Sequence, residues 1–283
     1  MSTTTTTVEA GSDAEHTQDE LIDAVLEEVM KRVSPATNGG ESNDAAPSHG
    51  AVAGLVQLTE FIGIGLGETQ GIVIANVDPA VHDLMGIDPK YRSIGVIGGR
   101  IGAGPQIMAA DDAVKATNTE IVSVEMPRDT KDGAGHGNLI VFGAEDVSDA
   151  RRAVEVTLET LPKYFGDVYA NSQGHLELQY SARASRALDF VFNAPQGRAF
   201  GLIIGAPAVI GVLMIDTAVK AANVQVVGYG SPTKNTSFSN EVMIWVSGDA
   251  GAVRQAVISG REVGKQLLGA WGEEPKSVTQ PYI

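Results

Sequence analysis

The chain contains the same motif twice, about 105 positions apart. Segment 111–122 (DDAVKATNTEIV) returns as 216–227 (DTAVKAANVQVV), and at a slightly shorter spacing 151–154 (RRAV) returns as 254–257 (RQAV). This period is far longer than the roughly 20 to 50 residues of a solenoid repeat. In a chain of 283 residues it fits two copies of a small domain, each able to bury its own core.

Composition excludes several classes of function. The chain has no cysteine, which removes disulfides, thiolate nucleophiles and cysteine-based zinc sites. Its formal net charge of -15 argues against nucleic acid and anionic membranes as partners, because both repel an acidic protein. The sequence shows neither the layout of a signal peptide nor an apolar run long enough to span a membrane. We therefore expect a soluble protein that stays in the cytoplasm.

The N-terminal region has an organisation of its own. We expect residues 1–16 to be disordered, 17–33 to form an amphipathic helix, and 34–57, rich in Pro, Gly, Ser and Asn, to be a flexible linker. A helix of this length is marginal alone in water. It could fold back onto its own domain or dock into a groove of a partner, and the long linker favours the partner. The apolar face consists of Leu21, Ile22, Val25, Leu26 and Val29.

Both repeats show the same order of apolar and polar segments. The pattern predicts a strand (93–97; 200–204), a helix ending near Asn118 or Asn223, two strands (120–125 and 138–142; 224–229 and 241–246) and a second helix (148–161; 250–268). One further strand precedes each unit, at 71–77 and 175–180. This is an α+β plan of the split βαβ, ferredoxin-like kind, with helices on one face of an antiparallel sheet. The domains are predicted at 58–168 and 169–283.

No motif predicts catalysis or a bound cofactor. The glycines at 63, 65 and 67 and the run 98–104 (GGRIGAG) lack the spacing of a dinucleotide-binding loop. His82, His136 and His175 show no spacing typical of metal ligands, and no GxSxG motif is present. We expect no catalytic residue, no metal and no cofactor.

Two features recur in both copies and have two interpretations each. Lys115 and Lys220 occupy the same position in AVKAxN. Each could simply complement the negative end of its helix, with the following Asn as a cap. Loops 127–137 and 231–240 could be solvated hairpins, but they exceed the usual two to five residues, and extra length often marks function.

Taken together, the motifs resemble the shell-protein domain of bacterial microcompartments, the BMC domain. The second copy carries them clearly (AVKAAN, VQVVGY, a strand ending in SGD, AGAVRQAV), and the first more weakly (AVKATN, EIVSVE, FGAEDVSDARRAV). The strand before each unit resembles the circularly permuted version of this domain. The whole arrangement is similar to the tandem-domain shell proteins of propanediol-utilisation compartments, over about residues 58–283, with the helix extending the likeness to residue 17.

The resemblance implies a structural protein and not an enzyme. Three chains with two domains each would form a homotrimer that mimics a hexamer. This pseudohexamer would be a hexagonal tile that packs edge to edge with other shell proteins around enzymes in the bacterial cytoplasm. Lys115 and Lys220 match the edge lysine that meets a neighbouring tile. The matched pore-loop positions are Gly133, Gly135, His136, Gly137, Thr236, Ser237, Phe238 and Ser239.

The long loops and Phe238 depart from the single-domain pattern. They imply a gated or blocked centre, with small diols or polyols passing through side channels within the trimer. The amphipathic helix at 17–33 is then a candidate to link lumen enzymes to the shell. The alternative is a two-domain α/β protein, an enzyme or a small-molecule-binding protein, with a ligand cleft between the repeats. The sequence does not decide which pathway is encapsulated.

Overall fold

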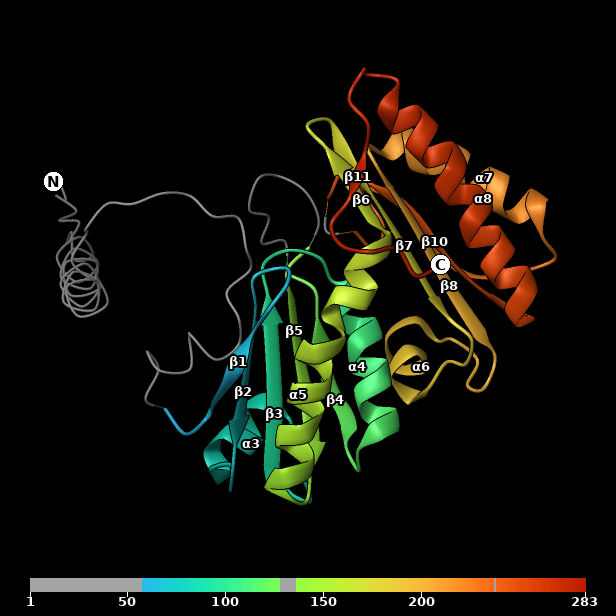
Figure 1. The fold of residues 1–283 in the computed structure, drawn as a ribbon. Helices are drawn as coiled ribbons and strands as arrows, with labels where there is room; N and C mark the ends of the chain where they lie inside the picture. Colours follow the sequence, from blue (N-terminus) through green and yellow to red (C-terminus); the bar gives the residue numbers. More distant parts are fainter. Residues whose placement is uncertain (1–57, 128–135, 237) are drawn as a thin grey trace, which may run out of the picture. The chain divides into compact units, whose positions relative to one another are not determined.

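The computed structural model describes residues 58–127, 136–236 and 238–283 (Figure 1). The predictions for 1–16, 17–33 and 34–57 lie outside these described residues. The described chain forms two antiparallel sheets, one from each repeat.

The first sheet has the strand order β1-β2-β3-β5-β4. Helices α4 (Gly104–Ala116) and α5 (Val147–Tyr164) lie along one face (Figure 1). Ile97, Ile140 and Phe142 point from the sheet into the core beneath these helices. The strands are β1 (Phe61–Gly65), β2 (Thr69–Ile74), β3 (Ser93–Gly99), β4 (Glu120–Glu125) and β5 (Asn138–Ala144).

The second sheet has the order β11-β6-β7-β8-β10-β9. Helices α7 (Ala208–Ala221) and α8 (Ala250–Gly269) cover one face, over a core that includes Leu176, Leu178 and Ile203. A short 3-10 helix, η2 (Phe165–Asp167), leads from α5 into this sheet. Its strands are β6 (Val168–Asn171), β7 (Gly174–Ser181), β8 (Ala199–Ala206), β9 (Gln225–Gly230), β10 (Val242–Gly248) and β11 (Lys276–Ser277).

Helix α4 joins the two repeats, because it packs against the first sheet on one side and against the second sheet on the other. Its Ile107 and Met108 belong to the core cluster that also contains Leu202, Ile204 and Met243 of the second sheet. The short helix α6 (Arg186–Phe192) packs against α4 and β4. Hydrogen bonding reinforces this contact, since the buried carboxylate of Asp111 in α4 accepts the backbone N–H of Ser185, the N-cap of α6, at 3.1 Å.

The second sheet is therefore covered on both faces, which explains the pattern of β7. Successive side chains of a strand point to opposite faces. Leu176 and Leu178 face α7 and α8, and the residues that alternate with them, His175, Glu177 and Gln179, face the first repeat. Glu177 and Gln179 are buried. A polar stripe thus lies between the repeats.

The predicted α+β class and the order of the main elements are confirmed, with differences at the edges. The strand predicted at 71–77 lies at 69–74, and the partner strands β1 and β6 and the short helices α3 (Pro79–Met85) and α6 were not predicted. The glycines at 63 and 65 belong to β1, where a Cβ on Gly65 would lie 2.6 Å from Leu161 of α5. Gly65 therefore allows close packing of the strand on the helix. The predicted domain boundary at 168/169 remains a prediction.

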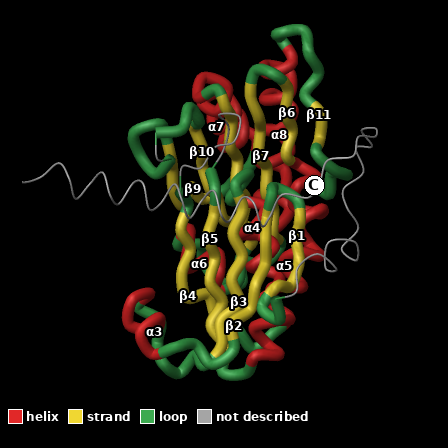
Figure 2. The backbone as a smooth tube through the Cα atoms, turned by 90° about the vertical axis from the view of Figure 1, so that its left-hand side faces the viewer, coloured by secondary structure: helices red, strands yellow, loops and turns green. Residues whose placement is uncertain are grey.

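Figure 2 shows the strands of the first sheet side by side, with α3 beyond one end of them. Within the part of the chain that the structure describes, no helix combines the length and apolar character needed to cross a membrane.

Candidate functional site

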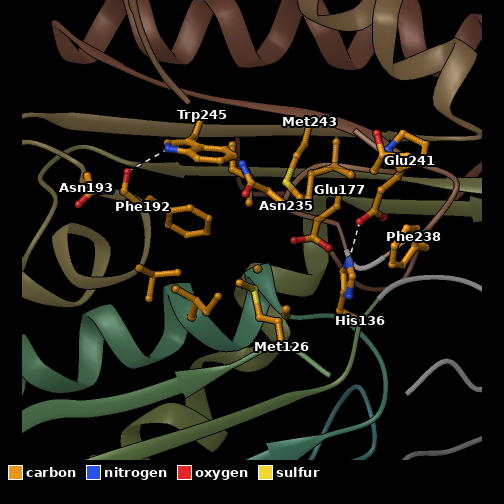
Figure 3. A pocket seen from close by; sticks show the side chains of 18 residues that line it. Met126, His136, Glu177, Phe192, Asn193, Asn235, Phe238, Glu241, Met243 and Trp245 are labelled. Carbon is orange, nitrogen blue, oxygen red and sulfur yellow. Dashed lines mark hydrogen bonds and ion pairs between the residues drawn. The ribbon is translucent and has the colours of Figure 1, made fainter. Parts of the chain in front are cut away.

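A pocket of about 630 Å³ lies between the two repeats. The first repeat contributes Gly104 and Ile107 at the start of α4, and the second contributes Glu177 from β7 and Phe192 from the end of α6. Figure 3 shows these walls facing one another, with Trp245 on the side of the second sheet. The pocket exists only because α4 packs against the neighbouring sheet.

One wall of the pocket is aromatic and firmly held. The indole Nε1–H of Trp245 donates to the backbone oxygen of Phe192 at 2.9 Å, and the two rings lie 5.4 Å apart (Figure 3). The Phe192 ring also contacts Phe200, with ring centroids 5.2 Å apart. These contacts fix the C-terminus of α6 against the sheet and keep the wall apolar.

The polar side of the pocket is a cluster around Glu241. His136 Nε2 lies 2.8 Å from Glu241 Oε1 (Figure 3), and His175 Nε2 lies 3.7 Å from Glu241 Oε2. Ser239 Oγ lies 3.4 Å from the same His136 nitrogen. His136 precedes β5 and Glu241 precedes β10, so the ends of the two equivalent loops meet here.

Two buried carboxyl groups of this cluster have opposite pKa shifts. Burial by itself raises the pKa of Glu241, but the hydrogen bond from His136 and the nearby His175 outweigh it and hold the pKa at about 2. Burial, together with repulsion from Glu241, raises the pKa of Glu177 to about 8, while the backbone N–H of Gly104 opposes this more weakly. At neutral pH the pocket therefore contains one carboxylate and one neutral carboxylic acid.

Several polar atoms of the cluster are unused within the described residues. Glu177 Oε1, His136 Nδ1 and His175 Nδ1 are buried and have no hydrogen-bond partner. Buried polar groups without partners are costly, so a ligand that bonds to them is favoured. Carboxyl and imidazole groups both donate and accept, and they can hydrogen-bond the hydroxyls of a small polar molecule.

The predicted pore-loop residues divide into four groups. His136 and Ser239 join the cluster around Glu241, while Thr236 is buried and donates its hydroxyl to Ser231 O at 2.7 Å. Gly137 is buried and donates its N–H to Pro127 O. Phe238 is exposed at the rim of the pocket, with a positive φ of 67°. Gly133, Gly135 and Ser237 lie outside the described residues, as do Leu21, Ile22, Val25, Leu26 and Val29 of the N-terminal helix.

The two equivalent lysines lie in the last turns of α4 and α7 and differ in exposure. The Lys220 side chain is 73% exposed and pairs with Asp216 at 2.6 Å. The Lys115 side chain is 34% exposed and pairs with both Asp111 and Asp112. The repeat places both lysines alike on their helices, but the second repeat covers part of Lys115.

The carboxyl groups and His175 were not singled out from the sequence, although a signal exists. His175, Glu177 and Gln179 alternate with leucines in a segment predicted as a strand, so one face of that strand had to be polar. His136 and Glu241 stand 105 positions apart, which is close to the repeat spacing. Among the described residues, no group of His, Asp and Glu side chains is arranged to hold a metal ion.

Comparison with known proteins identifies the class of protein to which this fold belongs. The family model for the BMC domain matches residues 93–173 and again 199–271, which together exceed half of the chain. The chain therefore belongs to the BMC-domain family, with two copies of the domain in tandem.

Within that family the chain is similar to proteins named PduB. It is 57% identical over 266 residues to the bacterial microcompartment shell protein PduB of Citrobacter freundii, covering 93% of this chain and 98% of the relative. It is 54% identical over 277 residues to that of Salmonella typhimurium, with the same shares covered. A crystal structure of a trimeric bacterial microcompartment shell protein PduB matches with a TM-score of 0.78 and 50% identity, over 80% of this chain and 100% of that one.

Proposed function

We propose that this chain is a structural shell protein of a bacterial microcompartment of the propanediol-utilisation type. In this proposal it forms a homotrimer, a pseudohexameric tile, within a shell in the bacterial cytoplasm. One observation carries the proposal: the apolar face of α7 is open, whereas the equivalent face of α4 is covered by the other repeat of the same chain.

The repeat relates the two faces residue by residue. At the spacing of 105 positions, Ile107 and Met108 in α4 correspond to Val212 and Leu213 in α7. The first two are each 1% exposed, and the second two are 54% and 42% exposed. Contiguous exposed apolar side chains on a helix mark an interface. The face of α7 therefore has the composition of a buried contact without the covering element.

The chain also carries an element that fits this open face. Helix α3 corresponds to α6, because their N-caps Asp78 and Ser185 and their left-handed C-caps Gly86 and Asn193 both stand 107 positions apart. At the same spacing, Leu84 and Met85 correspond to Val191 and Phe192.

The two helices differ in what their last residues contact. Val191 and Phe192 of α6 pack against the cluster that contains α4, whereas Leu84 and Met85 of α3 are 86% and 43% exposed. Helix α3 and the first sheet of a second copy can therefore cover α7 as α6 and the second sheet cover α4.

Such head-to-tail contacts either close into a ring or continue as a filament. The related solved structure is described as trimeric, and three two-domain chains give a closed ring with six similar domains. Lys115 and Lys220 are proposed as edge residues that meet neighbouring tiles. The curated relatives are shell proteins, and the proposal assigns the chain no catalytic residue, metal or cofactor.

We further propose that the pocket between the repeats lies on a route for small diols or polyols. Its unpaired polar atoms and apolar wall suit a molecule that has hydroxyl groups on a short carbon chain. This function requires no conversion of the ligand. The pore-loop residue His136 lines the polar end of the pocket, Ser239 contacts His136, and Phe238 lies at the rim.

The proposed helix at 17–33 would bind lumen enzymes through its apolar face. Its support is the spacing of the apolar residues and the linker that follows. If purified compartments from a strain lacking residues 1–50 held the usual amount of enzyme, this part of the proposal would be wrong.

Native mass spectrometry and electron microscopy of the purified full-length chain test the main proposal. We expect a mass of three chains and, at high concentration, sheets or tubes. A monomer that never forms sheets would instead support the alternative of a two-domain binding protein or enzyme.

A further inference from the structure

The carboxyl groups of Glu177 and Glu241 favour a negative charge in the pocket. Among the described residues that line it there is no Lys and no Arg. Glu241 has two histidine partners, but Glu177 is only 6% exposed and its Oε1 has none. Figure 3 shows the Glu177 side chain reaching into the pocket beside His136. None of the described lining residues is a Lys or Arg that could neutralise a negative charge on Glu177.

We propose that Glu177 makes the pocket select uncharged polyols over small carboxylate anions, and that the proton on Glu177 sets the strength of this selection. The inference rests on the proposed role of the pocket in the passage of small polar molecules. It adds to that role the class of molecule that is rejected and the residue that rejects it.

The physical reason is repulsion in a site that water screens poorly. With Glu177 neutral, Glu241 is the one carboxylate among the described lining residues that repels an anion, and the two histidines beside it reduce its effect. When Glu177 loses its proton, a second negative charge stands within a few ångströms of any bound molecule. At such separations, even with an effective dielectric constant of about 20, the repulsion changes an equilibrium by tenfold or more. A neutral polyol is affected little, because a carboxylate and a carboxylic acid can both hydrogen-bond a hydroxyl.

The groups around Glu177 explain why it holds its proton. Burial and repulsion from Glu241 disfavour the charged form and raise the pKa to about 8, and the N–H of Gly104 compensates only in part. A pH change from 7 to 9 therefore spans the ionisation of this group. The neighbours from each element are His175 on β7, Glu241 before β10, His136 before β5, Gly104 on α4, Leu202 and Ile204 on β8, and Met243 on β10.

The equivalent position of the first repeat offers a comparison. Gln70 on β2 lies 107 positions before Glu177, the same spacing that relates α3 to α6. An amide at this position cannot ionise. The selection is therefore expected only in the pocket within the chain, and not at the corresponding contact between chains.

Glycerol and glycerate are a suitable pair of probes, because they are similar in size and differ by one carboxylate. A carboxylic acid of this kind is ionised at both pH 7 and pH 9. The affinities of the full-length protein for each probe are measured by saturation-transfer nuclear magnetic resonance at both pH values. The proteins compared are the wild type, Glu177→Gln and, as a control for loss of one acidic group, Glu274→Gln, whose side chain is exposed outside the pocket.

We expect the preference of the wild type for glycerol over glycerate to rise about tenfold between pH 7 and pH 9. In Glu177→Gln the preference stays constant, which also separates the effect from any titration of His136 or His175. Glu274→Gln behaves as the wild type. Thermal melting and native mass establish that the variants keep the fold and the assembly.

Two results would overturn the inference in different ways. If the preference of Glu177→Gln for glycerol rises with pH as in the wild type, Glu177 is not the residue that rejects anions. The proposed passage of polyols then still stands. If the wild type binds neither probe at either pH, the proposed role of the pocket fails and the selection by Glu177 fails with it.

Discussion

Helices α4 and α7 carry the same motif in two different surroundings. Ile107 and Met108 of α4 are sealed between the two repeats, and Val212 and Leu213 of α7 are open. Both helices carry apolar side chains at these equivalent positions, but only those of α4 are buried within the chain. We infer from this difference that a second copy completes the contact at the open face of α7, and that the chain is the repeating unit of a larger ring.

The largest effect is expected when a charge is placed on each face. Met108→Arg puts an unpaired charge into a buried core position outside the pocket, at a cost of several kcal/mol, and should leave no stable folded protein. Val212→Arg should leave the fold intact and abolish the trimer. Circular dichroism and size-exclusion chromatography with light scattering check both outcomes. A Val212→Arg variant that remains trimeric would show that α7 is not the interface.

The second-largest effect concerns the pH dependence of the free energy of unfolding, which Glu177 should influence and the equivalent Gln70 should not. In the wild type the folded state holds the Glu177 proton more tightly than the unfolded state, whose pKa is near 4.5. The stability that proton binding by Glu177 adds to the folded state is therefore fully present below pH 4.5 and is lost as the pH rises to about 8. The loss approaches about 1.4 kcal/mol per pH unit at most.

Glu177→Gln lacks this loss, because an amide does not titrate. Relative to the wild type, its free energy of unfolding should rise between pH 4.5 and 8, as measured by urea denaturation. Gln70→Ala serves as the control and should keep the wild-type slope. Parallel slopes for the wild type and Glu177→Gln would contradict the raised pKa of Glu177.

A smaller effect is expected from the edge lysines. Lys220 is more exposed and has one acidic partner, whereas Lys115 has two and is partly covered. Lys220→Ala should reduce sheet formation in electron micrographs more than Lys115→Ala, and the double variant should abolish it. All three should remain trimeric. Loss of the trimer in any of them would mean that these residues are not at the tile edge.

The smallest effect concerns the backbone of Phe238. Its φ of 67° is unfavourable for a residue with a side chain, at a cost of order 1 kcal/mol. Because the side chain is exposed, Phe238→Gly should raise the free energy of unfolding by up to about 1 kcal/mol in denaturant titrations. A clear loss of stability would indicate that the Phe238 ring makes a contact in the assembly.

The main elements could be predicted from the sequence because their signals are local. The recurrence of AVKAxN places α4 and α7, and the alternation in β7 identifies a strand. The short helices α3 and α6 could not be predicted, because seven residues carry too little periodicity and their stability comes from packing. Strand β1 was obscured by the glycines that allow α5 to approach it.

The candidate site could be predicted only in part. His136 and Ser239 were indicated by the paired loops; the structure places His136 in the pocket wall and Ser239 in contact with His136. Glu177 and Glu241 were missed because a carboxyl group becomes unusual only through what surrounds it. The burial that raises the pKa of Glu177 depends on α4 of the other repeat, which lies more than 60 positions away in the chain.

Cross-linking through introduced cysteines tests the closed trimer directly, because the chain has no cysteine of its own. Leu84→Cys combined with Val212→Cys places thiols on the two faces proposed to meet between copies. The control, Val191→Cys with Ile107→Cys, places them at the equivalent positions within one chain. After treatment with a short thiol cross-linker, we predict covalent products of the first variant up to three chains and no larger, and a single-chain mass for the control. Products that stay at one chain in the first variant, or extend beyond three, would contradict the closed trimer built on the open face of α7.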